Sequence, residues 1–276
     1  MFNNPGPIGV FDSGYGGLTI LRELRALMPQ HDYLYLGDNA RAPYGTRSYD
    51  VVYRYTRQAV ATLFERGCHL VILACNTASA KALRTIQQHD LPTLAPNRRV
   101  LGVIRPTAEI VGNVTKSRHV GILATTGTIL SHSYDLEIRK LHPDITVTGQ
   151  DCPMWVPLVE NFEFDSPGAD YFVEKRISML LQRDPQIDAI ILACTHYPLL
   201  LPKIRKYIPS GISIISQGEH VARSLSTYLT NHPDMAGRIT GGGTLHCLTT
   251  ENTDKFCATA CRFLGHEVEA DNIVLS

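Results

Sequence analysis

Residues 69–86 read HLVILACNTASAKALRTI, and residues 188–205 read DAIILACTHYPLLLPKIR. Each stretch opens with a short apolar run, reaches Ala-Cys, and continues into a helical pattern. The two cysteines, Cys75 and Cys194, coincide when the stretches are superposed. An earlier pair, IGVFDSGYGG at 8–17 and VGILATTGTI at 120–129, matches in the same order. The chain therefore contains a weak internal repeat, which predicts two similar halves.

Short apolar runs alternate with helical patterns along the chain, as at 8–11, 18–27 and 33–36. This alternation indicates parallel strands joined by helical crossovers. The runs VILA and IILA are apolar on both faces, as expected in a sheet covered by helices on both sides. We predict an α/β fold of two similar domains related by pseudo-symmetry, each with a mainly parallel sheet flanked by helices.

The predicted first domain comprises residues 1–99 and 213–276, and the second comprises residues 100–212. The proline- and arginine-rich stretch 91–99 is the expected first crossing between the domains, and the region 209–212 is the expected return. Ligands of open parallel sheets bind outside the carboxyl ends of the strands, where both cysteines lie. We therefore expect the active site in the cleft between the two domains.

Composition narrows the classes of function. The chain has 276 residues, of which 44% are hydrophobic and 19% are charged, as in ordinary globular proteins. Lys plus Arg and Asp plus Glu number 26 each, so no basic field would attract nucleic acid or an anionic membrane. A small-molecule substrate is the better expectation. The N-terminal MFNNPGPIGVF lacks the features of a signal peptide, and no apolar run is long enough to span a membrane, so we expect a cytoplasmic protein.

The seven cysteines are odd in number and lack the spacing of a disulfide framework, so we expect reduced thiols. Cys257 and Cys261 lie four residues apart on a predicted helix, but no histidine or second cysteine pair stands at a zinc spacing, and no metal is predicted. The turn at 12–17 departs from the full dinucleotide-binding pattern because residue 19 is threonine, which disfavours a nucleotide role.

Both repeated cysteines precede hydrogen-bonding residues at the turn into a predicted helix. Backbone N–H groups at a helix start favour anions, so they could hold a substrate carboxylate and lower a thiol pKa from about 8.5. His196 is an expected proton partner of Cys194, because the ordinary histidine pKa of about 6.5 permits exchange near neutral pH. The residues that follow the cysteines are Asn76 and Thr77 in the first half, and Thr195 and His196 in the second.

Three acidic residues are further candidates. Asp12 follows a buried strand, where a carboxylate either caps a helix or meets the substrate. Asp38 follows the strand at 33–36 and lies on the same rim as the loop 42–45, although a turn alone would explain the proline and glycine of that loop. Glu160 lies within an apolar run, where most acids simply face solvent.

Seven motifs, in this order along most of the chain, together resemble glutamate racemases. ACNTA and ACTHYP occur in looser form in related aspartate racemases, whereas FDSGYGGL and PYG resemble the glutamate enzymes specifically. The resemblance implies cofactor-independent interconversion of L- and D-glutamate by two cysteines, supplying D-glutamate for bacterial peptidoglycan. The motifs are FDSGYGGL (11–18), YLGD (35–38), PYG (43–45), ACNTAS (74–79), LATTGTI (123–129), PLVE (157–160) and ACTHYP (193–198).

By this resemblance Cys75 takes the α-proton of D-glutamate and Cys194 that of L-glutamate, assisted by Asp12 and His196. Glu160 and Asp38 are candidate assisting residues. The family also suggests a homodimer. The implied substrate-binding residues are Asp12, Ser13, Tyr44, Gly45, Asn76, Thr77, Thr125, Thr128, Thr195 and His196.

Two positions depart from the family pattern. Ser216-Gln217-Gly218 stands where many members have a form of Asp-Ser-Gly, and Arg105 introduces an unexpected charge. Both lie outside the catalytic motifs, so we expect them to bear on regulation or the subunit interface rather than on chemistry. Three rival functions stay open: a racemase for aspartate or another acidic amino acid, a non-catalytic two-lobed amino-acid-binding protein, and a single-cysteine decarboxylase or isomerase.

Overall fold

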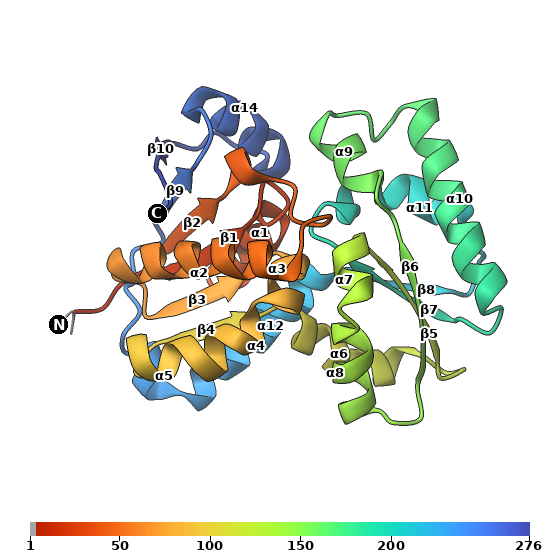
Figure 1. Ribbon diagram of the computed structural model, residues 1–276, viewed down its shortest axis with the longest axis horizontal. Helices are drawn as coiled ribbons and strands as arrows, with labels where there is room; N and C mark the ends of the chain where they lie inside the picture. The colour runs from red at the N-terminus through yellow and green to blue at the C-terminus, as the bar shows by residue number, and fades with distance from the viewer. Residues whose placement is uncertain (1–3) are drawn as a thin grey trace.

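The computed structural model describes residues 4–276 and consists of two lobes that lie side by side (Figure 1). Residues 1–3 lie outside the described residues. They begin both the predicted first domain and the N-terminal stretch that lacks the features of a signal peptide. The first lobe contains a six-stranded sheet in the order β10-β9-β2-β1-β3-β4, and the second contains a four-stranded sheet in the order β6-β5-β7-β8. All strand pairings within both sheets are parallel, which confirms the predicted fold class.

The strands are short, and the central ones are buried along their whole length. Burying one Ile, Leu or Val side chain contributes about 1.5–3 kcal/mol, so these strands supply much of the stabilisation of each lobe. The bounds in the first sheet are β1 (Ile8–Asp12), β2 (Tyr33–Gly37), β3 (Leu70–Leu73), β4 (Arg99–Gly102), β9 (Leu245–Thr249) and β10 (Ala270–Asn272), and those in the second are β5 (His119–Ala124), β6 (Thr146–Asp151), β7 (Ala189–Ala193) and β8 (Ser213–Ile215).

The internal repeat is visible in the topology of the sheets. The order β2-β1-β3-β4 in the first lobe is repeated as β6-β5-β7-β8 in the second. The register is equivalent as well, because Gly9 lies opposite Val71 and Gly121 lies opposite Ile190. Superposing the sequence repeats matches Gly9 with Gly121 and Val71 with Ile190, so the same positions are paired in both lobes. Strands β9 and β10 extend the first sheet beyond the repeated unit.

Helices cover both faces of each sheet. Several begin where the sequence provides a capping side chain, as at Ser48, which accepts a hydrogen bond from the backbone N–H of Val51. The helices of the first lobe are α1 (Leu18–Leu27), η1 (Asn39–Arg41), α2 (Tyr49–Glu65), α3 (Asn76–Lys81), α4 (Leu83–Thr85), η2 (Ile86–Asp90), α5 (Leu91–Leu94), α12 (Gln217–Asn231), α13 (Pro233–Ala236) and α14 (Thr253–Leu264). Those of the second are α6 (Ile104–Val114), α7 (Thr126–Leu130), α8 (Ser133–Leu141), α9 (Trp155–Glu160), α10 (Pro167–Arg183), η3 (Tyr197–Leu200) and α11 (Leu201–Tyr207).

The crossings between the sheets differ from the predicted boundaries. Strand β4 belongs to the first sheet, so the chain leaves that sheet after Gly102 rather than within 91–99. Strand β8 belongs to the second sheet, so the return follows Ile215 rather than 209–212. Both are edge strands of three or four residues with partly exposed side chains, which leave only a weak apolar signal in the sequence.

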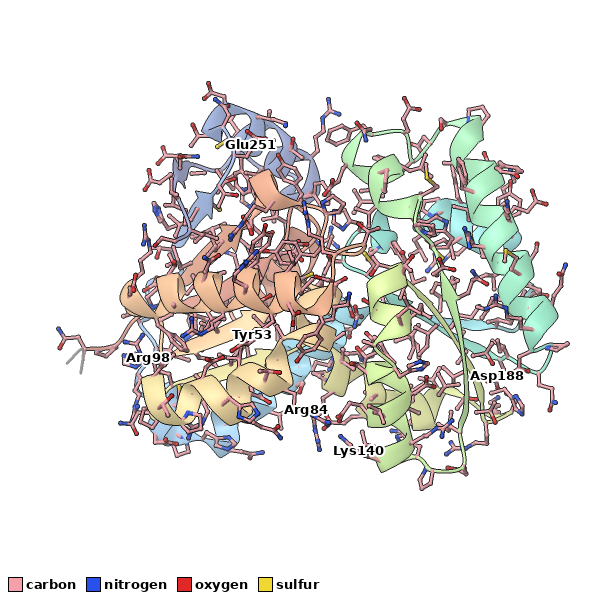
Figure 2. The ribbon with its side chains drawn as sticks, in the orientation of Figure 1. Tyr53, Arg84, Arg98, Lys140, Asp188 and Glu251 are labelled. Atoms are coloured by element: carbon pink, nitrogen blue, oxygen red, sulfur yellow. The ribbon has the colours of Figure 1, made fainter. Side chains whose placement is uncertain are left out.

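The lobes also meet through charged side chains at the surface. Arg84, labelled near the junction of the two lobes in Figure 2, lies 3.8 Å from Glu137 of α8. The Arg84 side chain is largely exposed and that of Glu137 is partly buried, and ion pairs at the surface contribute about 0–1 kcal/mol. The buried contacts described below therefore hold the lobes together more strongly. In residues 4–276 the structure contains no helix with both the length and the apolar character needed to cross a membrane.

Candidate active site

A cavity of about 120 Å³ lies between the lobes and is lined by both repeated cysteines. Cys75 follows β3 of the first sheet and Cys194 follows β7 of the second, so equivalent strand ends present the two thiols. Each residue is only 6% exposed. Of the residues predicted to act at the site, those that line the cavity are Ser13, Tyr44, Gly45, Cys75, Asn76, Thr77, Thr125, Glu160, Cys194, Thr195 and His196.

Cys75 is the N-cap of α3. Its sulfur accepts a hydrogen bond from the backbone N–H of Ala78 at 3.4 Å and lies 3.4 Å from the hydroxyl oxygen of Ser13. These contacts favour a thiolate, but burial and the nearby carboxylate of Asp12 outweigh them and raise the pKa of Cys75 to about 12. The expectation that the helix start lowers this pKa is therefore wrong, because desolvation is the larger effect. Cys75 is a thiol at neutral pH.

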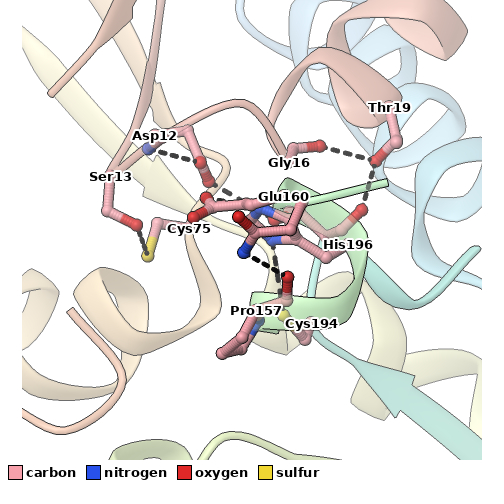
Figure 3. A network of polar contacts seen from close by, with 12 residues as sticks. Asp12, Ser13, Gly16, Thr19, Cys75, Pro157, Glu160, Cys194 and His196 are labelled. Carbon is pink, nitrogen blue, oxygen red and sulfur yellow. Dashed lines mark hydrogen bonds and ion pairs between the residues drawn. The ribbon is translucent and has the colours of Figure 1, made fainter. Parts of the chain in front are cut away.

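Cys194 has a different set of neighbours (Figure 3). Its sulfur lies 3.8 Å from Nδ1 of His196, and Nε2 of the same ring lies 3.1 Å from a carboxylate oxygen of Glu160. Burial alone lowers the pKa of His196, but hydrogen bonds to Cys194 and Glu160 outweigh it and raise this pKa to about 10. His196 is therefore an imidazolium at neutral pH, and its positive charge lies beside the sulfur of Cys194. The chain continues as the 3₁₀ helix η3 from Tyr197, rather than as the predicted α-helix directly after the cysteine.

Asp12 lies beneath the glycine-rich turn and is 1% exposed. Its carboxylate accepts a hydrogen bond from the backbone N–H of Gly14 at 2.9 Å and one from the hydroxyl of Thr195 at 3.5 Å. Burial raises the pKa of Asp12, and the positive charge of His196 opposes that rise. Asp12 does not line the cavity itself. Its hydrogen-bond partner Thr195, on the opposite lobe, does line it.

Gly16 lets the two lobes approach closely at this point. A Cβ atom at this position would collide with the hydroxyl of Thr195 and with the imidazole ring of His196. The neighbouring Thr19 donates a hydrogen bond to the carbonyl of Thr195 at 3.0 Å (Figure 3). The glycine-rich turn therefore serves as the surface against which the His196 loop packs.

Three threonine hydroxyls form a triangle across the lobes. Thr77 of the first lobe lies 3.0 Å from Thr125 and 3.3 Å from Thr128, and the two residues of the second lobe lie 3.1 Å apart. Thr125 also caps α7 by accepting from the backbone N–H of Thr128. Of these three residues, Thr77 and Thr125 line the cavity and Thr128 does not, so Thr128 orients the other two hydroxyls from behind.

The loop that carries Tyr44 and Gly45 is fixed from both sides. Asp38 is fully buried and accepts hydrogen bonds from the hydroxyl of Tyr44 and from Nε of Arg41, the latter at 2.7 Å. On the other side, the carbonyl of Gly45 accepts a hydrogen bond from the backbone N–H of Gly127 in the second lobe at 2.7 Å. Asp38 is therefore placed behind the cavity wall, where it holds the loop.

The structure also brings residues to the site that the sequence motifs did not indicate. Pro153 and Val156 line the cavity from the segment around α9 and, together with Pro157 of the PLVE motif, provide an apolar wall. Gln217 donates and accepts hydrogen bonds in a buried network that includes Asn76. Gln217, in the Ser216-Gln217-Gly218 departure, does not line the cavity itself but contacts Asn76, which does.

The geometry supports acid and base chemistry on two sides of one small molecule. Two thiols reach a common cavity from equivalent strand ends, one beside an imidazolium and the other in a form that keeps its proton. Hydroxyl and backbone groups around them can hold carboxylates. The fold and the site together define a two-lobed α/β enzyme with paired cysteines.

Comparison with known proteins agrees with this class. Residues 18–225 match the model of the Asp/Glu/Hydantoin racemase family. A glutamate racemase of Ruegeria sp. (strain TM1040) is 38% identical over 271 residues, covering 95% of this chain and 97% of the relative. The crystal structure of a glutamate racemase from Bacillus anthracis aligns with a TM-score of 0.89 and 34% identity, covering 100% of this chain and 99% of that one.

A further similar structure is that of glutamate racemase from Francisella tularensis subsp. tularensis SCHU S4 in complex with D-glutamate, with a TM-score of 0.87, 30% identity, and coverage of 100% and 99% of the two chains. The chain is an amino-acid racemase of the Asp/Glu/Hydantoin racemase family. Within that family it belongs to the glutamate racemases.

Proposed function

We propose that the chain interconverts L- and D-glutamate without a cofactor, with Cys75 and Cys194 as the two acid and base groups. The observation that carries the proposal is the placement of both thiols, from pseudo-symmetric strand ends, on one cavity between the lobes. Racemisation removes the α-proton from one face of the substrate and returns a proton to the other. Two thiols on opposite lobes match that requirement.

The protonation states at neutral pH favour one starting form. The imidazolium of His196 lies beside Cys194, which we assign as the base in this direction, whereas Cys75 retains its proton because its pKa is raised to about 12. In this form Cys194 takes the α-proton of L-glutamate and Cys75 delivers a proton to the opposite face. The reverse reaction needs the thiolate at Cys75, where the hydroxyl of Ser13 and the backbone N–H of Ala78 stabilise the charge.

Substrate binding is assigned to the groups around the thiols. The hydroxyls of Thr77, Thr125 and Thr195 and the side-chain amide of Asn76 are donors for carboxylates, and the loop at Tyr44 and Gly45 adds backbone groups. Asp12 supplies negative charge close to the cavity for the substrate ammonium. The same donors stabilise the carbanion-like transition state, whose charge spreads onto the α-carboxylate.

We further propose that the enzyme is cytoplasmic, forms a homodimer and supplies D-glutamate for peptidoglycan. This part of the proposal rests on the resemblance to glutamate racemases. The predicted division into two domains, with the crossings adjusted to Gly102 and Ile215, provides the two walls of the site.

The proposal is tested by incubating L-glutamate with the purified protein in D₂O without added cofactor, following the α-hydrogen by NMR and the optical rotation. Exchange with loss of rotation, abolished in Cys75→Ser and in Cys194→Ser, is the expected result. Retained racemisation in either variant would reject the two-thiol mechanism. Faster racemisation of aspartate than of glutamate would favour the aspartate alternative, and binding of glutamate without exchange would indicate a binding protein.

A further inference from the structure

Three buried side chains form a closed ring of hydrogen bonds beneath the cavity. The amide nitrogen of Asn76 donates to the carbonyl oxygen of Gln217 at 2.6 Å. The amide nitrogen of Gln217 donates to the hydroxyl of Tyr134 at 2.6 Å. The hydroxyl of Tyr134 donates to the carbonyl oxygen of Asn76 at 2.7 Å, which closes the ring. Each of the three residues is 3% exposed, so water cannot easily replace these bonds.

The ring connects the two lobes at the point where the chain returns. Asn76 directly follows Cys75 and is the first residue of α3 in the first lobe. Tyr134 lies on α8 of the second lobe, and Gln217 is the first residue of α12, just after β8. The amide nitrogen of Gln217 also contacts Thr107 of α6 at 3.0 Å and the carbonyl of Val103 at 3.3 Å. Gln217 therefore touches both crossings between the lobes.

The ring fixes the direction in which Asn76 offers its remaining donor. A side-chain amide has two N–H groups, and Asn76 uses one of them on Gln217. Its carbonyl oxygen is held by Tyr134, so the amide cannot rotate without breaking two buried hydrogen bonds. Asn76 itself lines the cavity next to Cys75. The second N–H is thus available to a carboxylate in the cavity, at an orientation set from the opposite lobe.

We propose that Gln217 is a positioning residue for racemisation, which holds Asn76 against Tyr134 of the second lobe and so fixes the Cys75 side of the site when the lobes are together. The proposal rests on the two-thiol function proposed above. It assigns a role to a residue at which this chain departs from the common family pattern. A shorter side chain at 217 would not bridge both the amide of Asn76 and the hydroxyl of Tyr134.

The test compares Gln217→Met, which keeps the length of the side chain and removes its hydrogen bonds, with Tyr134→Phe, which removes one oxygen atom. Gln182→Met, on the exposed face of α10, is the matched control. The ring variants leave buried partners unsatisfied and free Asn76 to turn, so kcat/KM should fall about ten- to hundredfold in each, chiefly through KM. The double variant should have a kcat/KM no lower than that of the less active single variant, because both substitutions break the same ring.

Isotope effects separate positioning from a loss of folded protein. We expect the primary isotope effect with α-deuterated D-glutamate, which Cys75 deprotonates, to rise in Gln217→Met and Tyr134→Phe relative to that with α-deuterated L-glutamate. Wild-type KM values and isotope effects in both variants would overturn the proposal. So would reduced activity with unchanged isotope effects, since it indicates fewer folded molecules. Failure of the proposed function would appear elsewhere, as racemisation that persists in Cys75→Ser.

Discussion

Nδ1 of His196 lies 3.8 Å from the sulfur of Cys194. At the equivalent strand end of the first lobe, the sulfur of Cys75 lies beside the hydroxyl of Ser13 instead. The two halves of the chain therefore share a topology and differ in the electrostatic environment of their thiols. Because the equilibrium constant of a racemisation is unity, kcat/KM must be equal for the two enantiomers. The asymmetry can be measured only through pH profiles, isotope effects or kcat and KM taken separately.

The alkaline limit of activity should depend on Glu160. The pKa of His196 is raised to about 10, so the ring is positively charged at neutral pH. This charge, and its interaction with the neighbouring sulfur of Cys194, are lost as the pH rises through that value. Glu160→Gln removes one of the groups that raise this pKa. We expect the alkaline limb of kcat/KM to move to lower pH. The exposed Glu163→Gln is the control, and an unmoved limb would show that Glu160 does not set the charge of His196.

Ser13→Ala should weaken the step in which Cys75 acts as the base. The hydroxyl of Ser13 stabilises the thiolate of Cys75 and has no comparable contact with Cys194 among the described residues. Loss of one hydrogen bond to a charged group costs about 1.5–3 kcal/mol, so kcat/KM should fall about tenfold or more. The primary isotope effect with α-deuterated D-glutamate should rise more than that with the L-enantiomer. An equal change for both enantiomers would contradict the assignment.

Asp38→Asn should release the loop that carries Tyr44. The carboxylate accepts from Tyr44, Arg41 and Thr250, and an amide cannot satisfy all three donors. We expect KM for glutamate to rise about tenfold with a smaller change in kcat, because the proposed role of the loop is binding rather than proton transfer.

Asp90→Asn is a matched control for this variant, since Asp90 also accepts from a tyrosine and an arginine, Tyr53 and Arg57, and does not line the active-site cavity. Equal effects of the two substitutions on KM, measured in initial-rate assays, would show that Asp38 has no specific role in the site.

Gly16→Ala should abolish most of the activity by forcing the lobes apart. The added methyl group would collide with Thr195 and His196, which belong to the opposite lobe. Overpacking of this kind lowers the free energy of unfolding by about 1–3 kcal/mol. The displaced imidazolium would also no longer lie beside the sulfur of Cys194. Gly168→Ala is the control, because a methyl group there meets only the Ser166 hydroxyl at 3.6 Å. Activity and thermal unfolding are the measurements, and full activity in Gly16→Ala would contradict the packing argument.

Substrate should enter through relative movement of the lobes. The cavity is small, and both thiols are 6% exposed, so the closed arrangement leaves little access. We expect small-angle scattering to show a more compact particle with glutamate than without it. Identical profiles under the two conditions would count against lobe movement.

Much of the architecture could be predicted from the local pattern of residues. The apolar runs of β1, β3, β5 and β7 are encoded in consecutive residues, and the repeat of these runs predicted the pseudo-symmetric sheets. The edge strands β4 and β8 could not be predicted in the same way. They are short and partly exposed, so the predicted crossings lie several residues earlier in the chain than the observed ones.

The sequence by itself determined that Cys75 and Cys194 follow equivalent strands and that the chain has the motifs of a glutamate racemase. Both are encoded locally, because strand formation and turn chemistry depend on neighbouring residues. Only the tertiary structure decided the surroundings of each thiol. Desolvation raises the pKa of Cys75 where the local helix start alone suggested the opposite. The contact of Glu160 with His196 and the ring through Gln217 also join residues far apart in the chain. Burial and electrostatic interaction depend on such distant neighbours, and no local pattern specifies them.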